Sequence, residues 1–281
     1  MKLDTLDTNA AVLDHLDVGA IRRRLVSDVM GAHIYVFGDV PSTNAVLRGL
    51  ADAGVQEGTV VLAESQQAAR GRGDTAWFSP PGVNLYASAL FRSALVPAAV
   101  PIFGCMALLA IADTLRGLGV SATVRWPNDV MVGGRKIAIV RLEPASAGHH
   151  VPYVVVGLRV NVNVRGADLI EALGAGAAEA TSVREELGRP IDRNAFTAAL
   201  LTHLEEELRL LRELGVAAIV RAWSDHDALQ GCHVEVTDAA GAFTGRVGGI
   251  DTRGDLIVVA DADGSHRPIV SGAIRLLEML S

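Results

Sequence analysis

The chain contains the stretch Arg125-Trp126-Pro127-Asn128-Asp129, followed after a short apolar run by Gly134-Arg135-Lys136-Ile137-Ala138. Pro127 forces a turn, and a carboxylate exposed at that turn, Asp129, is a candidate Mg²⁺ ligand. The plainer interpretation is a simple turn, because Asn and Asp favour turns through local hydrogen bonds.

Working outward from this stretch, apolar runs with turn signals between them predict successive strands at 120–126, 130–132, 136–143 and 153–161. Gly133-Gly134 marks a hairpin between the second and the third of these strands. Further strands are expected upstream at 34–37, 59–64 and 84–91. Helices are expected at 17–30, 44–53 and 99–118, together with a long helix capped by Asp192. This mixture predicts an α+β fold with a mixed sheet.

After residue 229 the sequence pattern changes: short runs typical of strands are separated by turns rich in Asp and Gly. Such spacing over about 50 residues is typical of a small antiparallel barrel. We therefore expect one large domain at 1–229 and a small β-barrel at 230–281.

Composition excludes several classes of protein. The chain has 281 residues, half of them hydrophobic, and a formal net charge of −7, so a broad basic nucleic-acid footprint is not expected. Cys105 and Cys232 are its two cysteines, which excludes a disulfide scaffold and fits a reducing cytoplasm. The N-terminus lacks an apolar run, and no stretch is long enough to span a bilayer. A cytoplasmic protein without membrane contact is expected.

Two basic features are candidates for chemistry. Arg70 and Arg72 flank a glycine in a polar loop after a predicted strand, where two guanidiniums and backbone N–H groups suit phosphate or carboxylate oxygens. An exposed, solvated loop is the alternative. Lys2 and Lys136 are the two lysines among 25 basic residues. Lys136 is therefore either required for chemistry that an arginine would not perform, or present by chance.

Taken together, the motifs are far more specific than any one of them. Their order resembles that of the biotin protein ligases over nearly the whole chain: Pro41-Ser42-Thr43-Asn44, Gln66, Arg70-Gly71-Arg72, Trp77-Phe78-Ser79-Pro80, Asn84-Leu85-Tyr86, Trp126-Pro127-Asn128-Asp129, Gly134-Arg135-Lys136, Asn161-Val162-Asn163 and Val270-Ser271-Gly272. The resemblance implies a core like that of class II aminoacyl-tRNA synthetases, followed by a small SH3-like barrel.

The resemblance also implies a two-step reaction. ATP and biotin, with Mg²⁺, would give biotinyl-adenylate, and a lysine amine of a biotin carboxyl carrier domain would then attack. Residues 1–229 would form the catalytic domain, and the small barrel is expected to dock on it and to aid this transfer more than chemistry at phosphorus. Lys136, Arg70 and Arg72 would be catalytic, with Lys136 stabilising negative charge at the α-phosphorus. The implied nucleotide and metal residues are Arg70, Arg72, Arg125, Asn128, Lys136 and Asn161 for ATP, and Asp129 for the metal.

The expected acid pocket departs from the family pattern. Its implied residues are Ser42, Thr43, Gln66, Trp77, Ile139, Arg141 and Arg159. Ser42, Thr43 and Gln66 would bind the ureido ring of biotin, and Trp77 would pack beside it. Ile139 and Arg159 stand where the family has glycine, and Arg141 replaces an aliphatic residue. Strand alternation places Ile139 and Arg141 on one face, so two guanidiniums would enter a pocket for a neutral ring.

Three hypotheses remain open from the sequence. The chain is a biotin protein ligase, or a ligase of the same fold that activates a smaller or more anionic acid for another acceptor, or a non-catalytic relative that binds a ligand. The form of the family with an N-terminal DNA-binding domain needs extra residues, so repressor activity and DNA binding are not expected. Whether the chain forms a homodimer is left open.

Overall fold

The computed structural model of the protein describes residues 15–67, 78–92, 99–145, 151–238 and 241–278. A seven-stranded sheet has the order β1-β2-β3-β7-β6-β5-β4. β1 and β2 are parallel and all other neighbours antiparallel, which confirms the expected mixed sheet. Its strands are β1 (Ile34–Val40), β2 (Val60–Gln66), β3 (Leu85–Phe91), β4 (Ala122–Arg125), β5 (Asp129–Val132), β6 (Arg135–Pro144) and β7 (Val154–Val160).

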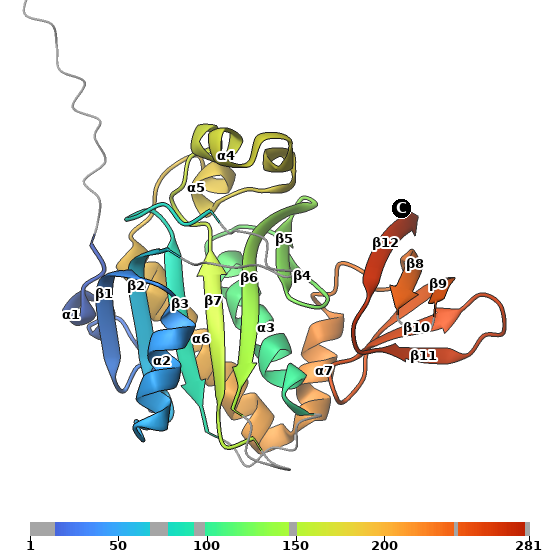
Figure 1. The fold of residues 1–281 in the computed structure, drawn as a ribbon, viewed down its shortest axis with the longest axis horizontal. Helices are drawn as coiled ribbons and strands as arrows, with labels where there is room; N and C mark the ends of the chain where they lie inside the picture. The colour runs from blue at the N-terminus through green and yellow to red at the C-terminus, as the bar shows by residue number, and fades with distance from the viewer. Residues whose placement is uncertain (1–14, 68–77, 93–98, 146–150, 239–240, 279–281) are drawn as a thin grey trace, which may run out of the picture.

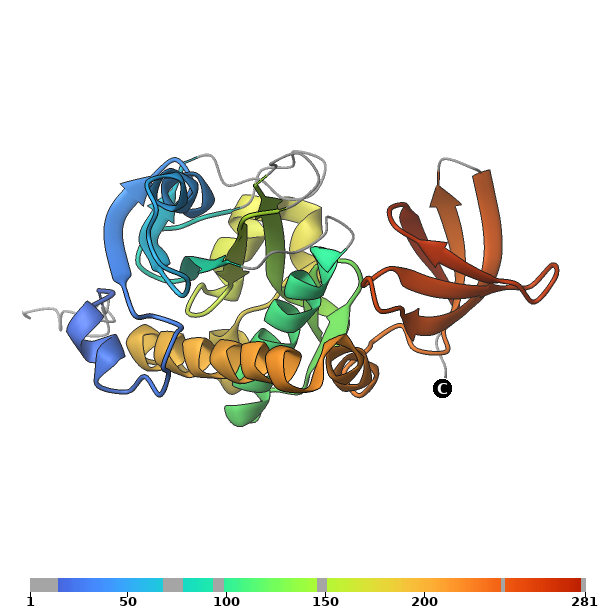
Figure 2. The same cartoon turned by 90° about the horizontal axis from the view of Figure 1, so that it is seen from below.

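Helices cover the two faces of this sheet unequally (Figure 1). Two long helices pack on one face and α2 on the other, as the view from below shows (Figure 2). The helices are α1 (Val18–Arg22), α2 (Thr43–Asp52), α3 (Pro101–Gly117), α4 (Gly166–Leu173), the 3₁₀ helix η3 (Gly174–Glu179), α5 (Val183–Leu187), α6 (Arg193–Leu214) and α7 (Val216–Ser224). No helix in the described ranges combines the length and apolarity needed to cross a membrane.

Strand alternation separates a core face from a site face. On β7, Val156, Leu158 and Val160 join the large core under α3 and α6, whereas Val155 packs in a smaller cluster with α2. Gly157 and Arg159 lie on this second face, because successive residues of a strand point to opposite sides. α2 covers only part of that face, so the remainder is left for the site.

The start of the chain corrects one prediction. A helix was expected over residues 17–30, but α1 ends at Arg22. The carboxylate of Glu205 on α6 accepts hydrogen bonds from the Ser27 hydroxyl and from the backbone N–H groups of Val29 and Met30, at 2.8, 3.1 and 2.7 Å. These bonds replace the helical ones, since a backbone N–H that binds a distant carboxylate is lost to its own helix.

A second sheet follows α7. Its five antiparallel strands have the order β11-β10-β9-β8-β12, as expected for the small barrel. They are β8 (His233–Asp238), β9 (Gly241–Ile250), β10 (Leu256–Ala260), β11 (His266–Ile269) and β12 (Ala273–Glu278). Buried residues of this sheet, such as Val247 and Val258, belong to the same hydrophobic cluster as the main core. The barrel therefore docks on the main sheet and its helices, while the boundary near residue 230 stays a prediction.

Candidate active site

The N-terminus of α2 holds a buried polar cluster. Gln66, at the end of β2, accepts two hydrogen bonds through Oε1, from the backbone N–H of Thr43 at 2.9 Å and its hydroxyl at 3.2 Å. Ser42 is the N-cap residue, and its own side chain makes no capping bond. Gln66 Nε2 is buried and has no hydrogen-bond partner among the described residues. A buried amide with an unused donor is a group that a ligand acceptor would satisfy.

This cluster continues across the sheet through residues to which the sequence motifs had assigned no role. Ser88 Oγ on β3 lies 2.8 Å from Thr43 Oγ1 and 2.6 Å from Asn44 Oδ1, and Asn44 Nδ2 donates to Glu143 Oε1 at 3.1 Å. Asn44 is part of the quoted Ser-Thr-Asn motif, so a signal for it was present. The space for its amide depends on Gly157, because a Cβ at 157 would overlap the Asn44 amide.

A row of opposed residues crosses five strands next to this cluster. The pairs run Tyr86 with Arg159, Arg159 with Ile139, Ile139 with Asp129, and Asp129 with Arg125. The acid-pocket candidates Ile139 and Arg159 are thus adjacent to the phosphate-side candidates. Ile139 lies between them, because it is opposite Arg159 on one side and opposite Asp129 on the other.

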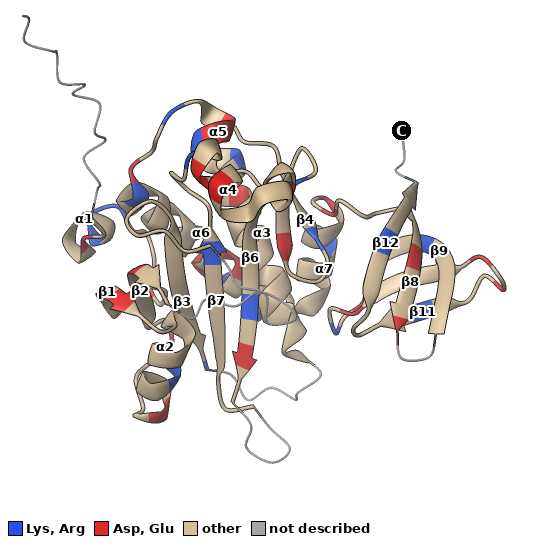
Figure 3. Ribbon diagram, turned by 45° about the horizontal axis from the view of Figure 1, so that its top comes forward, with Lys and Arg blue, Asp and Glu red and all other residues tan. Residues whose placement is uncertain are grey.

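The two arginines of the expected acid pocket differ in their surroundings. Arg159 is buried, whereas Arg141 is half exposed and its Nε lies 3.5 Å from Glu143 Oε1. Burial, followed by the nearby charge of Arg141, lowers the pKa of the Arg159 guanidinium to about 10, and Tyr86 and Glu143 act in the opposite direction. Basic residues on β6 and β7 stand out in the middle of the sheet (Figure 3).

On the phosphate side, one carboxylate is held by two cations. Lys136 Nζ lies 3.0 Å from Asp129 Oδ1, and Arg125 NH2 lies 2.8 Å from Asp129 Oδ2. Asn128, after the cis peptide between Trp126 and Pro127, braces the turn, because its side chain donates to Val140 O at 3.3 Å and its carbonyl accepts from Val140 N at 2.9 Å.

The same carboxylate was predicted to hold Mg²⁺. Each oxygen of Asp129 faces a cation, and Mg²⁺ needs carboxylate oxygens that are free to coordinate it. Across the described ranges, no three His, Cys, Asp or Glu side chains are grouped so that they could hold a metal ion. Asp129 does not fit as a metal ligand in this arrangement, and its role as one stays a prediction from the sequence.

A pocket lies where β6 and β7 meet α4 and η3. Lys136 and Asn161, both predicted for ATP, line it together with Phe78, Leu169, Leu173, Gly176, Glu179 and Ala180. Asn161 is buried, and its Nδ2 donates to Thr181 O at 3.0 Å. The α4 and η3 wall of the pocket was not predicted from the sequence. Arg70, Arg72 and Trp77 lie outside the described residues.

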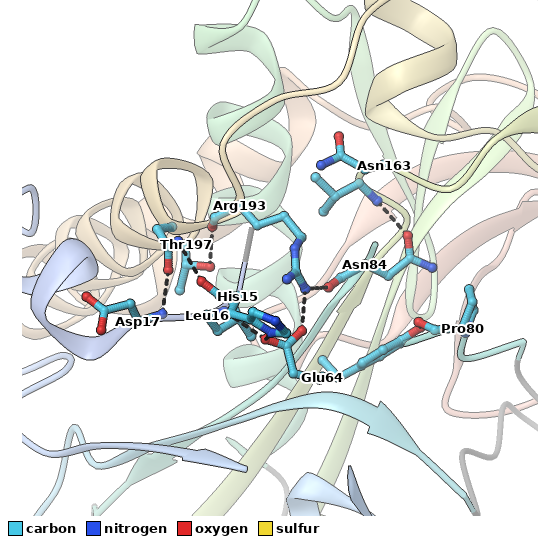
Figure 4. A network of polar contacts seen from close by, with 12 residues as sticks. His15, Leu16, Asp17, Glu64, Pro80, Asn84, Asn163, Arg193 and Thr197 are labelled. Carbon is cyan, nitrogen blue, oxygen red and sulfur yellow. Dashed lines mark hydrogen bonds and ion pairs between the residues drawn. The ribbon is translucent and has the colours of Figure 1, made fainter. Parts of the chain in front are cut away.

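Behind the site, a buried ion pair ties the strand ends together (Figure 4). Arg193, with a side chain that is 0% exposed, lies 2.9 Å from Glu64 Oε2 and donates to Asn84 O at 3.1 Å. Asn84 Oδ1 in turn accepts from Val162 N at 2.9 Å. Glu64 and Asn84 stand two residues before Gln66 and Tyr86, so the network fixes the strand ends that carry the site.

A family model of the biotin/lipoate A/B protein ligases matches residues 36–161. The biotin--[acetyl-CoA-carboxylase] ligase of Paracoccus denitrificans is 32% identical over 220 residues, which cover 77% of this chain and 90% of the relative. The bifunctional ligase/repressor BirA of Escherichia coli is 29% identical over 255 residues, or 90% of this chain and 77% of the relative.

Solved structures show the same fold. A mutant biotin protein ligase from Aquifex aeolicus in complex with biotin superposes with a TM-score of 0.72 at 24% identity, covering 88% of this chain and 99% of that chain. The ligase from the same organism in complex with biotin and ATP gives 0.71 at 23% identity, with coverages of 87% and 98%. The likeness confirms the expected synthetase-like core and SH3-like C-terminal sheet.

Proposed function

The chain belongs to the biotin/lipoate A/B protein ligase family, and we propose that it ligates biotin to a lysine of a carrier protein with consumption of ATP. A carboxylate oxygen of biotin attacks the α-phosphorus of ATP, and pyrophosphate leaves. The lysine amine then attacks the acyl carbon of the adenylate, loses a proton to solvent and forms an amide, while AMP leaves. Mg²⁺ bound to ATP would screen the charge of its phosphates.

The observation that carries this proposal is the position of Lys136. Its ammonium lines the same pocket as Asn161 and is oriented by Asp129, which Arg125 also holds. A preorganised cation beside a phosphate stabilises the charge that develops during attack, without reorganisation at that moment. Arg70 and Arg72 are proposed to add two further guanidiniums around the carboxylate and phosphates.

At the acid end, the proposal relies on the polar cluster around Gln66. The Nε2 of Gln66, which has no partner in the part of the chain that the structure describes, can hydrogen-bond a ureido ring together with the neighbouring Thr43 and Ser42. Trp77 is proposed to pack beside the ring. Ile139 is opposite both Arg159 and Asp129, so it would lie between the ring-binding end and the phosphate-binding end of the site.

A second candidate function is favoured by the buried Arg159. A guanidinium on the pocket face, opposite a bulky Ile139, leaves less space and more positive charge than a neutral ring requires. A smaller or more anionic carboxylic acid, transferred to a different amine, would use that charge. The first, adenylating step would be the same for both candidates.

Isotope exchange between ATP and pyrophosphate, measured with a panel of acids, tests both candidates. Biotin-dependent exchange, followed by transfer of labelled biotin to a carrier domain, supports the first. Exchange that depends only on a shorter or dicarboxylic acid supports the second. Absence of exchange with every acid, in protein folded by circular dichroism, would refute an adenylating function.

A further inference from the structure

The C-terminal barrel contacts the main sheet next to the phosphate side of the site. Trp126 is buried, and its Nε1 donates a hydrogen bond of 3.0 Å to the carbonyl of Gly254. Gly254 lies in the turn between β9 and β10, whereas Trp126 lies between β4 and β5. One barrel turn therefore touches the residue that separates Arg125 from the Asn128-Asp129 turn.

The barrel turn is built as a rigid unit. Asp251 Oδ1 accepts from the backbone N–H groups of Arg253 and Asp255, at 2.8 and 3.0 Å, and Gly254 N donates to Asp251 O at 3.0 Å. The Arg253 guanidinium lies 3.2 Å from Asp251 and 3.0 Å from Asp255. Because side chains and backbone brace the turn together, the Gly254 carbonyl is held in place before Trp126 meets it.

Gly254 is also seated against the main domain. It has a φ of +83°, and a Cβ there would lie 3.1 Å from Pro101 Cβ and 3.3 Å from the Pro101 carbonyl carbon, at the start of α3. Only glycine adopts this backbone region without strain and also permits so close an approach. The turn thus fits between α3 and the Trp126 indole.

The strand that leads into Trp126 is fixed from its other side by the linker to the barrel. Val124 N donates to His226 O, and Ala228 N donates to Val124 O, both at 2.8 Å. β4 is the last strand of its sheet, so the linker supplies pairing that its outer edge would otherwise lack. The β4–β5 segment is therefore clamped by the barrel turn and by the linker.

We propose that Trp126 is a positioning residue through which the docked barrel holds Arg125, Asp129 and Lys136 in the geometry needed for adenylate formation. The inference rests on the proposed function and assigns the barrel a part in the first step of the reaction. It differs from the transfer role expected from the sequence, because the contact lies on the phosphate side. Asp129 is the link: it follows Trp126 by three residues and lies 3.0 Å from the Lys136 ammonium.

Two substitutions break the contact from opposite sides. Trp126→Phe keeps a ring but removes the N–H, and Gly254→Ala disturbs the seat of the carbonyl. Gly264→Ala is the matched control, since Gly264 also has a positive φ, +67°, in a barrel turn, but a Cβ added there would meet nothing within 4 Å. Melting temperatures and circular dichroism identify any variant that fails to fold.

The first readout is the exchange between ATP and pyrophosphate. Both contact variants should lower kcat about fivefold, which at 1.36 kcal/mol per tenfold is about 1 kcal/mol, and leave the KM of the acid unchanged. In a Lys136→Ala background, Trp126→Phe should have no further effect, because it acts through Lys136. Unchanged kcat, an equal loss in Gly264→Ala, or multiplicative effects in the double variant would overturn the inference.

The second readout does not depend on the reaction. Amide hydrogen exchange over residues 123–132 should accelerate in Trp126→Phe and Gly254→Ala but not in Gly264→Ala. If the unmodified protein exchanges pyrophosphate with no acid, the proposed function fails. Amide hydrogen exchange then remains as the test of whether the barrel turn holds the β4–β5 segment in place. Faster amide exchange in the two contact variants would then support it, and unchanged exchange would overturn it.

Discussion

Arg159 on β7 lies directly opposite Ile139 on β6, on the sheet face that also carries Gly157 and Arg141. The floor of the expected acid pocket is therefore a buried cation beside a branched aliphatic side chain. Ile139 is at the same time opposite Asp129 on β5, so the pocket floor adjoins the phosphate side. Changes at these two positions should alter the choice of acid without touching the charged groups of the first step.

We expect the unmodified protein to bind biotin weakly, and the double variant Ile139→Gly, Arg159→Gly to bind it about tenfold tighter. The substitutions remove a large cationic side chain from the pocket face and return the space that the Ile139 side chain fills. Calorimetry in the presence of a non-hydrolysable ATP analogue measures the change. Tight binding by the unmodified protein would show that the arginine is accommodated elsewhere, and would remove the case for another acid.

Lys136→Ala should reduce adenylate formation by about tenfold or more, and Lys136→Arg should not restore it. A preorganised charge at a transition state contributes about 3 kcal/mol, and a planar guanidinium does not reproduce the geometry of a compact ammonium. The neighbouring Arg135, whose NH2 pairs with Glu186 at 2.8 Å, offers the control Arg135→Ala. Near-normal pyrophosphate exchange by Lys136→Arg would mean that the position needs only a cation.

Gly157→Ala should lower the free energy of unfolding by about 1–3 kcal/mol. The new methyl group overlaps the Asn44 amide and forces it away from Ser88 and Glu143. Denaturant titration measures the loss. Gly38→Ala on β1 is the control, because a Cβ there meets nothing within 4 Å. Equal stability of the two variants would show that the Asn44 cluster adapts freely.

The helical layer contains a carboxyl group that should make stability depend on pH. Burial, followed by the charge of Asp113, raises the pKa of Glu207 to about 7 from 4.5, while His226 opposes the shift and Glu206 adds to it. Between these values the folded state binds more protons than the unfolded state, so the Glu207 contribution is complete below pH 4.5 and is lost as pH rises through about 7.

Glu207→Gln should therefore flatten the fall in stability between pH 5 and pH 8 by roughly 1–3 kcal/mol. Urea titrations of both proteins at these two pH values give the comparison. The difference between the two proteins cancels the contributions of ionisable groups that do not interact with Glu207. An identical pH slope in the variant would show that Glu207 is ionised throughout.

The sequence was most informative where local pattern and tertiary environment agree. The β-branched runs around 59–64 and 153–161 form buried strands, and Asp192 caps α6 through bonds to Asn194 N and Ala195 N. The stretch 17–30 was wrong as a helix because Glu205, about 175 residues away in the chain, binds its backbone. No local rule contains that contact.

The candidate site was predictable in its motifs but not in its connections. Thr43 and Gln66 were expected on one ligand, and the structure joins them directly. The roles of Asn44 and Ser88 depend on side chains from α2, β3 and β6 that meet only after the sheet is formed. The α4 and η3 wall escaped prediction because both helices are short and mostly exposed: Leu169 is buried in α4, and η3 has no buried residue.

The two ion pairs of Asp129 have a consequence for the free enzyme. Because Lys136 and Arg125 share the Asp129 carboxylate, the three groups together carry a net charge of +1, and they attract stray anions less strongly than two bare cations would. An incoming phosphate must compete with this internal carboxylate for the ammonium. Under the proposed function, this competition would lower the affinity of the site for every anion and would favour a polyanion such as a nucleotide, because several phosphate charges can together replace one carboxylate.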